Sequence, residues 1–136
     1  METLRIEGGG VLGVGVDAVD VDRFRRVLAR TPTLRRRLFT DGELADCRGR
    51  GDEAMHLGAR FAAKEAVMKA LGVGLFAVGF EDIEVRITST GAPTVNLAGR
   101  ADDALRSVGG DRVLVSLTHT DTLAEAFAVA IGPTSA

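Results

Sequence analysis

The stretch RFAAKEAVMKALGVG, residues 60–74, ends the longest helical pattern of this chain and decides how the rest can pack. From residue 55 to residue 71, apolar residues recur every three or four positions, and Gly72 and Gly74 then stop the pattern. The apolar side of residues 60–71 is mostly alanine, which lets a neighbouring element approach closely. We therefore expect a long central helix with other elements packed tightly against it.

The other side of this helix carries the only two lysines of the chain, Lys64 and Lys69, around Glu65, with Arg60 at its edge. A solvated surface with Glu65 and Lys69 as an i,i+4 pair would explain these charges. The bulky apolar residues among them, and the glycine-rich turn that follows, favour a ligand instead. Three cations and the N–H groups of residues 72–74 suit a polyphosphate, and one carboxylate suits a metal ion bound to it.

A second carboxylate for such an ion is expected on another rigid element, and Asp17 is the candidate. It lies near the end of VLGVGVDAV, residues 11–19, a β-branched run typical of a buried strand. An unpaired carboxylate is costly to bury there, although a turn or cap role explains Asp17 equally well. The nearby glycines lack the GxGxxG spacing and the chain has no GK[ST] motif, which excludes the common nucleotide-binding loops.

The remaining patterns mix helices and strands without regular βαβ alternation, which indicates an α+β fold. Thr40 and Glu43 have the spacing of a capping box and open a short helix to about residue 48. Further helices are expected over residues 22–29, 34–39 and 100–108, and strands over residues 83–88, 94–97, 112–118 and 124–131. We expect residues 1–10 to be a flexible leader and residues 11–136 to form a single domain.

The composition of the chain argues against several classes of protein. The 136 residues have a net charge of −2, which argues against a general nucleic-acid binder, yet residues 23–37 contain seven arginines and no acid. The chain has one cysteine, Cys47, and therefore cannot form an internal disulfide. It has no cluster of cysteines and histidines of the kind that binds zinc. We expect no functional role for Cys47 or His56. No signal peptide and no apolar run of roughly 20 residues is present, so we expect a cytoplasmic protein.

Several motifs in order resemble one family. They are GVGVDAVDVDRF at residues 13–24, LFTDGEL at 38–44, RFAAKEAVMKALGVG at 60–74, EDIEVRITSTGAPTV at 81–95 and VLVSLTHTDTLAEAFAVAI at 113–131. Together they resemble the holo-acyl-carrier-protein synthases, the short single-domain class of 4′-phosphopantetheinyl transferases, over essentially the whole chain beyond residue 10. The resemblance implies that family's α+β fold, with a small antiparallel or mixed sheet packed against a long central helix.

The resemblance also implies an activity. Members transfer the 4′-phosphopantetheine group of coenzyme A to a serine hydroxyl of an apo acyl carrier protein, release adenosine 3′,5′-bisphosphate and require Mg²⁺. Those resembling this chain form homotrimers with active sites between subunits. The implied carrier serves fatty-acid or polyketide synthesis, and the sequence leaves that choice open.

The resemblance implies roles for particular residues, each taken from its position in the matching motif. Asp17 and Glu65 match the metal ligands, and Glu65 and Lys69 are the expected catalytic residues. Glu65 would take the serine proton through a water, and a lysine, Lys69 or Lys64, would offset charge on the leaving group. The expected coenzyme A contacts are Arg60, Lys64, Lys69, Gly72, Gly74 and His119.

A basic helix face is the expected carrier-binding surface. Arg23 matches a family residue that meets the carrier, and Arg26 and Arg30 follow it at spacings of three and four. Such a face would steer an acidic carrier protein toward the enzyme. Two alternatives stay open: a non-catalytic basic adaptor that binds an acidic protein or RNA, and a different magnesium-dependent nucleotide enzyme. The paired acids Asp17 and Glu65 favour an enzyme, since an adaptor has no use for them.

Overall fold

The computed structural model describes residues 9–74 and 76–133. The expected leader, residues 1–10, therefore lies almost entirely outside the described residues, and so do residues 134–136 of the expected domain. Within the described ranges, no helix is both long enough and apolar enough to cross a membrane.

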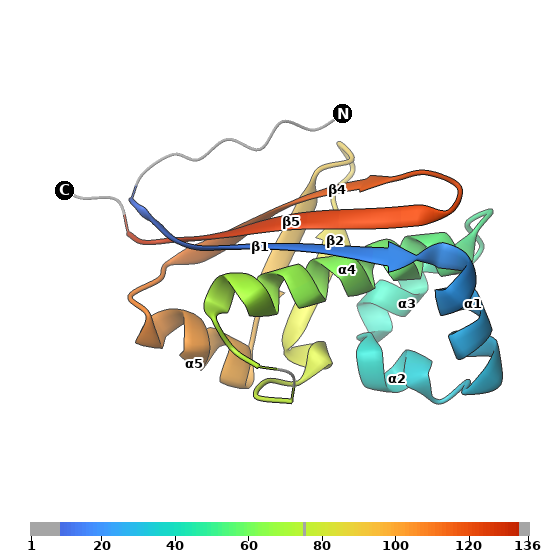
Figure 1. Ribbon diagram of the computed structural model, residues 1–136, viewed down its shortest axis with the longest axis horizontal. Helices are drawn as coiled ribbons and strands as arrows, with labels where there is room; N and C mark the ends of the chain where they lie inside the picture. Colours follow the sequence, from blue (N-terminus) through green and yellow to red (C-terminus); the bar gives the residue numbers. More distant parts are fainter. Residues whose placement is uncertain (1–8, 75, 134–136) are drawn as a thin grey trace.

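A three-stranded antiparallel sheet forms one layer of the molecule (Figure 1). Its order is β1 (Val11–Asp20), β5 (Leu123–Ile131) and β4 (Arg112–His119), so the last strand of the chain lies in the middle. A separate antiparallel hairpin consists of β2 (Ile83–Ile87) and β3 (Pro93–Leu97). All strand pairings of the described residues are antiparallel, and the expected α+β class is confirmed.

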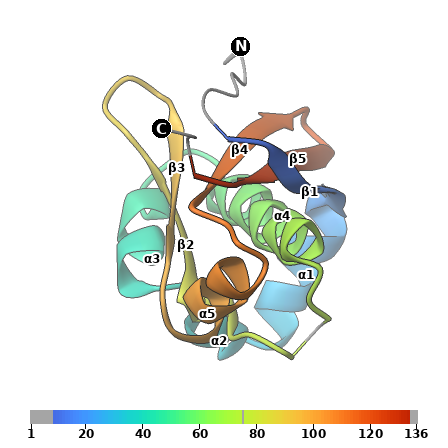
Figure 2. The ribbon, with the colours of Figure 1, turned by 90° about the vertical axis from the view of Figure 1, so that its left-hand side faces the viewer.

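The long helix α4 (Glu53–Leu71) lies across one face of the three-stranded sheet (Figures 1 and 2). The approach is close because β1 has glycine where it crosses the helix. A Cβ atom on Gly13 would collide with the carbonyl oxygen of Ala70, and one on Gly15 with that of Ala66. Glycine on the strand and alanine on the helix thus meet as one closely packed contact, as the alanine-rich face predicts.

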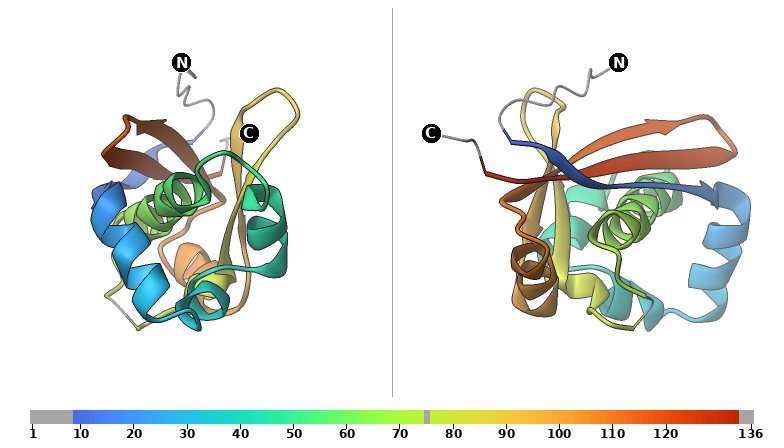
Figure 3. Two further views of the ribbon diagram at one scale, coloured as in Figure 1. Left: turned by 90° about the vertical axis from the view of Figure 1, so that its right-hand side faces the viewer. Right: turned by 60° about the vertical axis from the view of Figure 1, so that its left-hand side comes forward.

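Shorter helices follow β1 at one end of the sheet (Figure 3). They are α1 (Val21–Arg30), α2 (Leu34–Leu38) and α3 (Asp41–Cys47). Of these, α3 also lies beside β2, and α5 (Gly99–Ser107) and the 3₁₀ turn η1 (Phe80–Asp82) lie near the hairpin too (Figure 2). Asp20 caps α1 by accepting from the Arg23 N–H at 2.8 Å, and Thr40 and Glu43 form the expected capping box.

One expectation about α4 is wrong. The sequence suggests an open side offering three cations, but Arg60, Lys64 and Met68 are all buried. The reason is that α3 and β2 cover the helix on the side away from the sheet, so α4 is enclosed over most of its circumference. Among the charged residues of the motif, Lys69 is exposed and Glu65 is half-buried.

Candidate active site

A groove of about 680 Å³ opens where β1 passes into α1 and faces the middle of α4. Two predicted metal ligands, Asp17 from β1 and Glu65 from α4, both line it. The remaining lining residues are Ala18, Val19, Asp20, Arg23, Phe24, Val27, Leu34, Leu38, Phe61, Phe76 and Phe80. Two acids distant in sequence therefore share one cavity with a largely apolar wall.

The strand register explains why Asp17 reaches this groove. Gly13, Gly15 and Asp17 alternate along β1, so all three lie on the sheet face that meets α4. The Nζ of Lys69 donates to a carboxylate oxygen of Asp17 at 3.2 Å and to the Val16 carbonyl at 2.8 Å. The Lys69 side chain is 55% exposed and that of Asp17 is 17% exposed, so the lysine covers the acid from the solvent side.

Glu65 has an unusual electrostatic setting. Burial raises the pKa of its carboxyl, the charge of Asp17 raises it further, and Lys69 opposes both. The described residues contain no group of three or more potential metal-ligating side chains of the His, Cys, Asp and Glu types. The protein would thus supply two carboxylates, which fits a Mg²⁺ ion that takes its other ligands from phosphate and water.

Lys64 has a different place from the one expected. It is fully buried, and its Nζ donates to Glu43 at 2.6 Å and to the carbonyls of Phe80 at 2.8 Å and Ile83 at 2.6 Å. An ammonium group has three donors, so none is left for a phosphate. The second Glu43 oxygen accepts from the Val85 N–H at 2.8 Å. We therefore assign Lys64 to the link between α3, α4 and β2 and leave it out of the candidate site.

Arg60 is also buried, at 2% exposure, and lies outside the groove. Its Nη1 donates to the His56 carbonyl at 3.3 Å, while Nε and Nη2 have no partner among the described residues. A buried guanidinium with unpaired donors is costly, which points to an anionic acceptor beside it.

The glycine turn and His119 complete the predicted coenzyme A contacts. The N–H groups of Gly72 and Val73 bond to the carbonyls of Lys69 and Met68, so they close the helix instead of standing free. Gly72 adopts a φ of 70°, the left-handed conformation that glycine tolerates in this cap. Neither Gly74 nor His119 lines the groove; His119 lies exposed at the end of β4.

The arginines of α1 divide into two kinds. Arg23 lines the groove, and Arg23, Arg26 and Arg30 are all exposed with no ion pair within the described part of the chain. Arg25 instead binds Asp22 and Asp52 and ties α1 to the start of α4. The three predicted carrier-binding arginines are thus free to meet an acidic partner.

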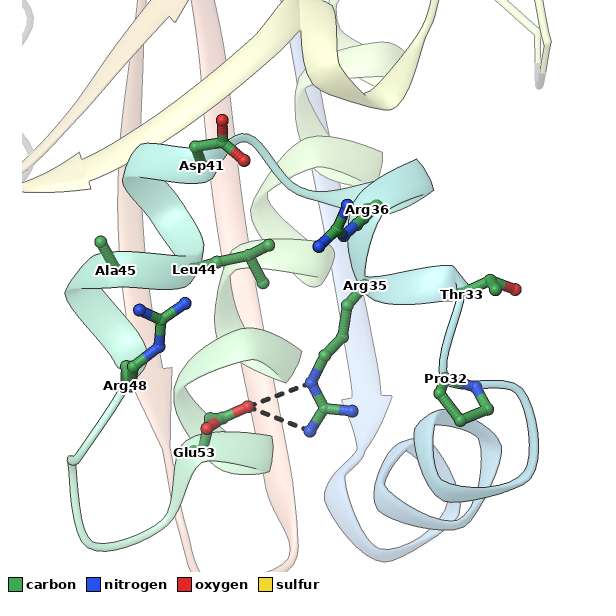
Figure 4. A pocket seen from close by; sticks show the side chains of 9 residues that line it. All are labelled: Pro32, Thr33, Arg35, Arg36, Asp41, Leu44, Ala45, Arg48 and Glu53. Atoms are coloured by element: carbon green, nitrogen blue, oxygen red, sulfur yellow. Dashed lines mark hydrogen bonds and ion pairs between the residues drawn. The ribbon is translucent and has the colours of Figure 1, made fainter.

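A second hollow, of about 940 Å³, lies between α2, α3 and the start of α4. Figure 4 shows Arg36 and Arg48 at its walls, with Arg35 hydrogen-bonded to Glu53 at 3.1 and 3.0 Å. Of the two acids that line it, Asp41 and Glu53, the second is already paired with Arg35. The groove at the end of β1 is the better candidate for chemistry.

Sequence reasoning missed the aromatic wall of the groove. Phe61 stacks between Phe24 and Phe80, with ring centroids 5.3 and 5.5 Å away. Phe61 lies one helical turn before Glu65, which was the available signal. His56 was also missed: its ring lies 6.5 Å from that of His119, and no sequence pattern links the two.

Comparison with known proteins identifies relatives of this chain in both sequence and fold. A family model described as the 4′-phosphopantetheinyl transferase superfamily matches residues 13–128. The holo-[acyl-carrier-protein] synthase of Moorella thermoacetica is 42% identical over 119 residues, which are 88% of this chain and 93% of that protein. The crystal structure of the Neisseria meningitidis holo-[acyl-carrier-protein] synthase has 31% identity and a TM-score of 0.81, covering 89% of this chain and 98% of that one. That of Bacillus anthracis, in complex with CoA (3′,5′-ADP), has 28% identity and a TM-score of 0.74, with 90% and 97% covered.

Proposed function

This chain belongs to the 4′-phosphopantetheinyl transferase superfamily, among the holo-[acyl-carrier-protein] synthases, and from that membership we propose its reaction and site. It transfers the 4′-phosphopantetheine group of coenzyme A to a serine hydroxyl of an apo acyl carrier protein and releases adenosine 3′,5′-bisphosphate. The observation that carries this proposal is the meeting of Asp17 and Glu65 in one groove. The coenzyme A complex of the Bacillus anthracis relative supports the choice of donor.

Asp17 and Glu65 are the residues that would hold Mg²⁺. The pair suits a cation because burial and mutual repulsion disfavour two ionised carboxyls there, as the raised pKa of Glu65 reflects. Bound there, the metal would neutralise charge on the diphosphate oxygens of the donor. Lys69 is exposed and next to Asp17, and it would offset charge on the departing phosphate.

Glu65 is the proposed proton acceptor. A carboxylate oxygen of Glu65 takes the proton of the carrier serine through a water while the serine oxygen attacks the phosphorus. The cationic side of α1, with Arg23 at the rim of the groove, would bring an acidic carrier to this point.

A transfer assay with mass detection tests the proposal. The purified chain, Mg²⁺, coenzyme A and an apo carrier protein should add the mass of one phosphopantetheine to the carrier. Glu65→Gln should reduce the rate at least about 100-fold, because it removes both a metal ligand and a base. Glu81→Gln, an exposed acid outside the groove, is the matched control and should keep the wild-type rate.

Two outcomes would contradict the assignment. An unchanged carrier mass with every apo carrier tried would count against the transferase. Full activity of Glu65→Gln would leave the transferase standing and remove Glu65 from the proposed site. If the carrier binds the chain and yet is never modified, the adaptor alternative is the better description.

A further inference from the structure

Phe76 lies in the loop that joins α4 to η1, and it lines the groove that contains Asp17 and Glu65. Its side chain is 82% exposed, the largest fraction of any bulky apolar residue that the structure describes. The other three phenylalanines of the groove stack in one row, whereas Phe76 makes no ring contact within the described part of the chain. The ring therefore stands at the rim of the groove and not in its packed wall.

The backbone of Phe76 is strained. Its φ is 71°, and within residues 9–74 and 76–133 it is the only residue other than glycine with a positive φ. The Ala77 N–H donates to the Gly74 carbonyl at 3.1 Å, which closes a tight turn with Phe76 at its third position. Glycine or asparagine normally takes a positive φ in such turns, because a bulky side chain crowds the backbone there. The chain thus carries a phenylalanine where local energetics favour glycine.

The strained turn and the exposed ring of Phe76 both cost free energy. A ring that is mostly in water adds little to the core that could offset the strain. Strained residues gather at functional sites, and exposed aromatic side chains are typical of binding surfaces. An aromatic ring that becomes covered only when a partner binds accounts for both features.

The exposure of Phe76 indicates a macromolecular partner. Most of its surface faces solvent, so a small ligand held inside the groove would leave the ring uncovered. The loop lies on the opposite side of α4 from the three-stranded sheet (Figure 1), and the exposed Arg23 of α1 lines the same groove. A protein that delivers a serine to Glu65 has to cover the rim of this groove, and Arg23 and Phe76 with it.

We propose that Phe76 is a docking contact for the apo carrier protein, and that an apolar side chain of the carrier covers the ring while the carrier's serine reaches Glu65. This inference rests on the proposed function, which supplies the partner. It adds an apolar anchor to the cationic face of α1. The arginines of that face speed the encounter with an acidic carrier, and the buried ring slows its dissociation.

Steady-state kinetics of the transfer reaction test this contact. Phe76→Ala should raise the KM for the carrier about tenfold, because an aromatic anchor is lost. The kcat and the KM for coenzyme A should stay within about twofold of the wild-type values, since only carrier binding changes. Calorimetric titration with the apo carrier, without coenzyme A, should show the same loss of affinity.

Two further variants control this experiment. Phe76→Tyr keeps an aromatic ring and should keep the wild-type KM for the carrier. Val108→Ala removes an exposed apolar side chain outside the groove and should leave all the kinetic constants unchanged.

Thermal unfolding tests the strain separately. Phe76→Gly and Phe76→Ala both remove the ring, but only glycine adopts a φ of 71° without strain. Phe76→Gly should therefore unfold at a temperature about 2–5 °C above that of Phe76→Ala, while both have the raised KM for the carrier. Equal unfolding temperatures would show that the turn is unstrained and would contradict this part of the proposal.

Three results would overturn the docking contact. They are a wild-type KM for the carrier in Phe76→Ala, a raised KM for coenzyme A alone, and a changed oligomeric mass by light scattering. The second would place the ring against the donor, and the third against another copy of the chain. If the wild-type protein modifies the carrier and Phe76→Ala does so with unchanged kinetics, only this inference fails. If the wild-type protein neither binds nor modifies the carrier, the proposed function fails together with it.

Discussion

Lys64 and Lys69 lie five residues apart on α4 and have opposite surroundings. Lys69 is mostly exposed and reaches Asp17, whereas Lys64 is enclosed and pairs with the buried Glu43. Burial lowers the pKa of Lys64, and the neighbouring Glu43 opposes that shift. Local sequence does not separate the two lysines, because both lie among apolar residues of one helix. The difference comes from α3 and β2, which cover Lys64.

Removing one member of the buried pair should destabilise the fold. Lys64→Met leaves Glu43 charged in the interior without its cation and should lower the free energy of unfolding by about 3–5 kcal/mol. Lys69→Met, at an exposed lysine, should lower it by less than about 1 kcal/mol. Urea unfolding followed by circular dichroism measures both, and equal losses would contradict the structural role of Lys64. Adding Glu43→Gln to Lys64→Met should recover part of the loss, since neither position of the pair then carries a charge.

At the scale of elements, the contact between β1 and α4 positions the site. The glycine spacing of VLGVGVDAV sets which face of the strand can touch the helix, and the same alternation aims Asp17 at Glu65. The capping box of α3 was readable from the spacing of Thr40 and Glu43 and is confirmed. The turn η1 was not expected, because its conformation depends on tertiary contacts, including the bond from Lys64 to the Phe80 carbonyl.

The strand–helix contact gives a prediction of its own. Gly15→Ala places a methyl group against the Ala66 carbonyl, and backbone on both sides leaves little room to adjust. The free energy of unfolding should fall by about 1–3 kcal/mol, and the Asp17–Glu65 geometry should suffer with it. Gly10→Ala is the control, because a Cβ there meets nothing within 4 Å. Denaturant unfolding of the two variants checks this, and equal stabilities would show that β1 does not need glycine at position 15.

At the scale of the whole molecule, the face of the sheet away from α4 carries exposed apolar side chains. Leu12, Val14 and Val16 of β1 and Phe127 of β5 are exposed there, and Val16 pairs with Phe127 across the strands. Contiguous apolar surface of this kind usually marks an interface. We propose that this face joins copies of the chain into the homotrimer implied by the resemblance, which would place a neighbouring subunit next to Asp17.

Light scattering with size-exclusion chromatography tests this assembly. The wild-type protein should have three times the chain mass of 14.3 kDa. Val14→Glu, at a residue 56% exposed in the single chain, should reduce the mass to that of one chain, because a buried carboxylate would face apolar groups. Val108→Glu, at an apolar residue 45% exposed near the end of α5, should leave the assembly intact. A monomeric wild-type protein would contradict the proposed trimer.

The sequence by itself determined the class of fold, the positions of most elements and the capping box at Thr40, and the family resemblance named Asp17 and Glu65 as a pair. These depend on local periodicity, on glycine and capping residues at fixed spacings, and on an ordered set of motifs. Only the tertiary structure decided that Lys64 and Arg60 are buried, that four phenylalanines line the groove and that His56 meets His119. The physical reason is that the burial of a side chain depends on which elements, distant in sequence, pack over it. The helical periodicity of α4 predicts only which of its residues face the sheet.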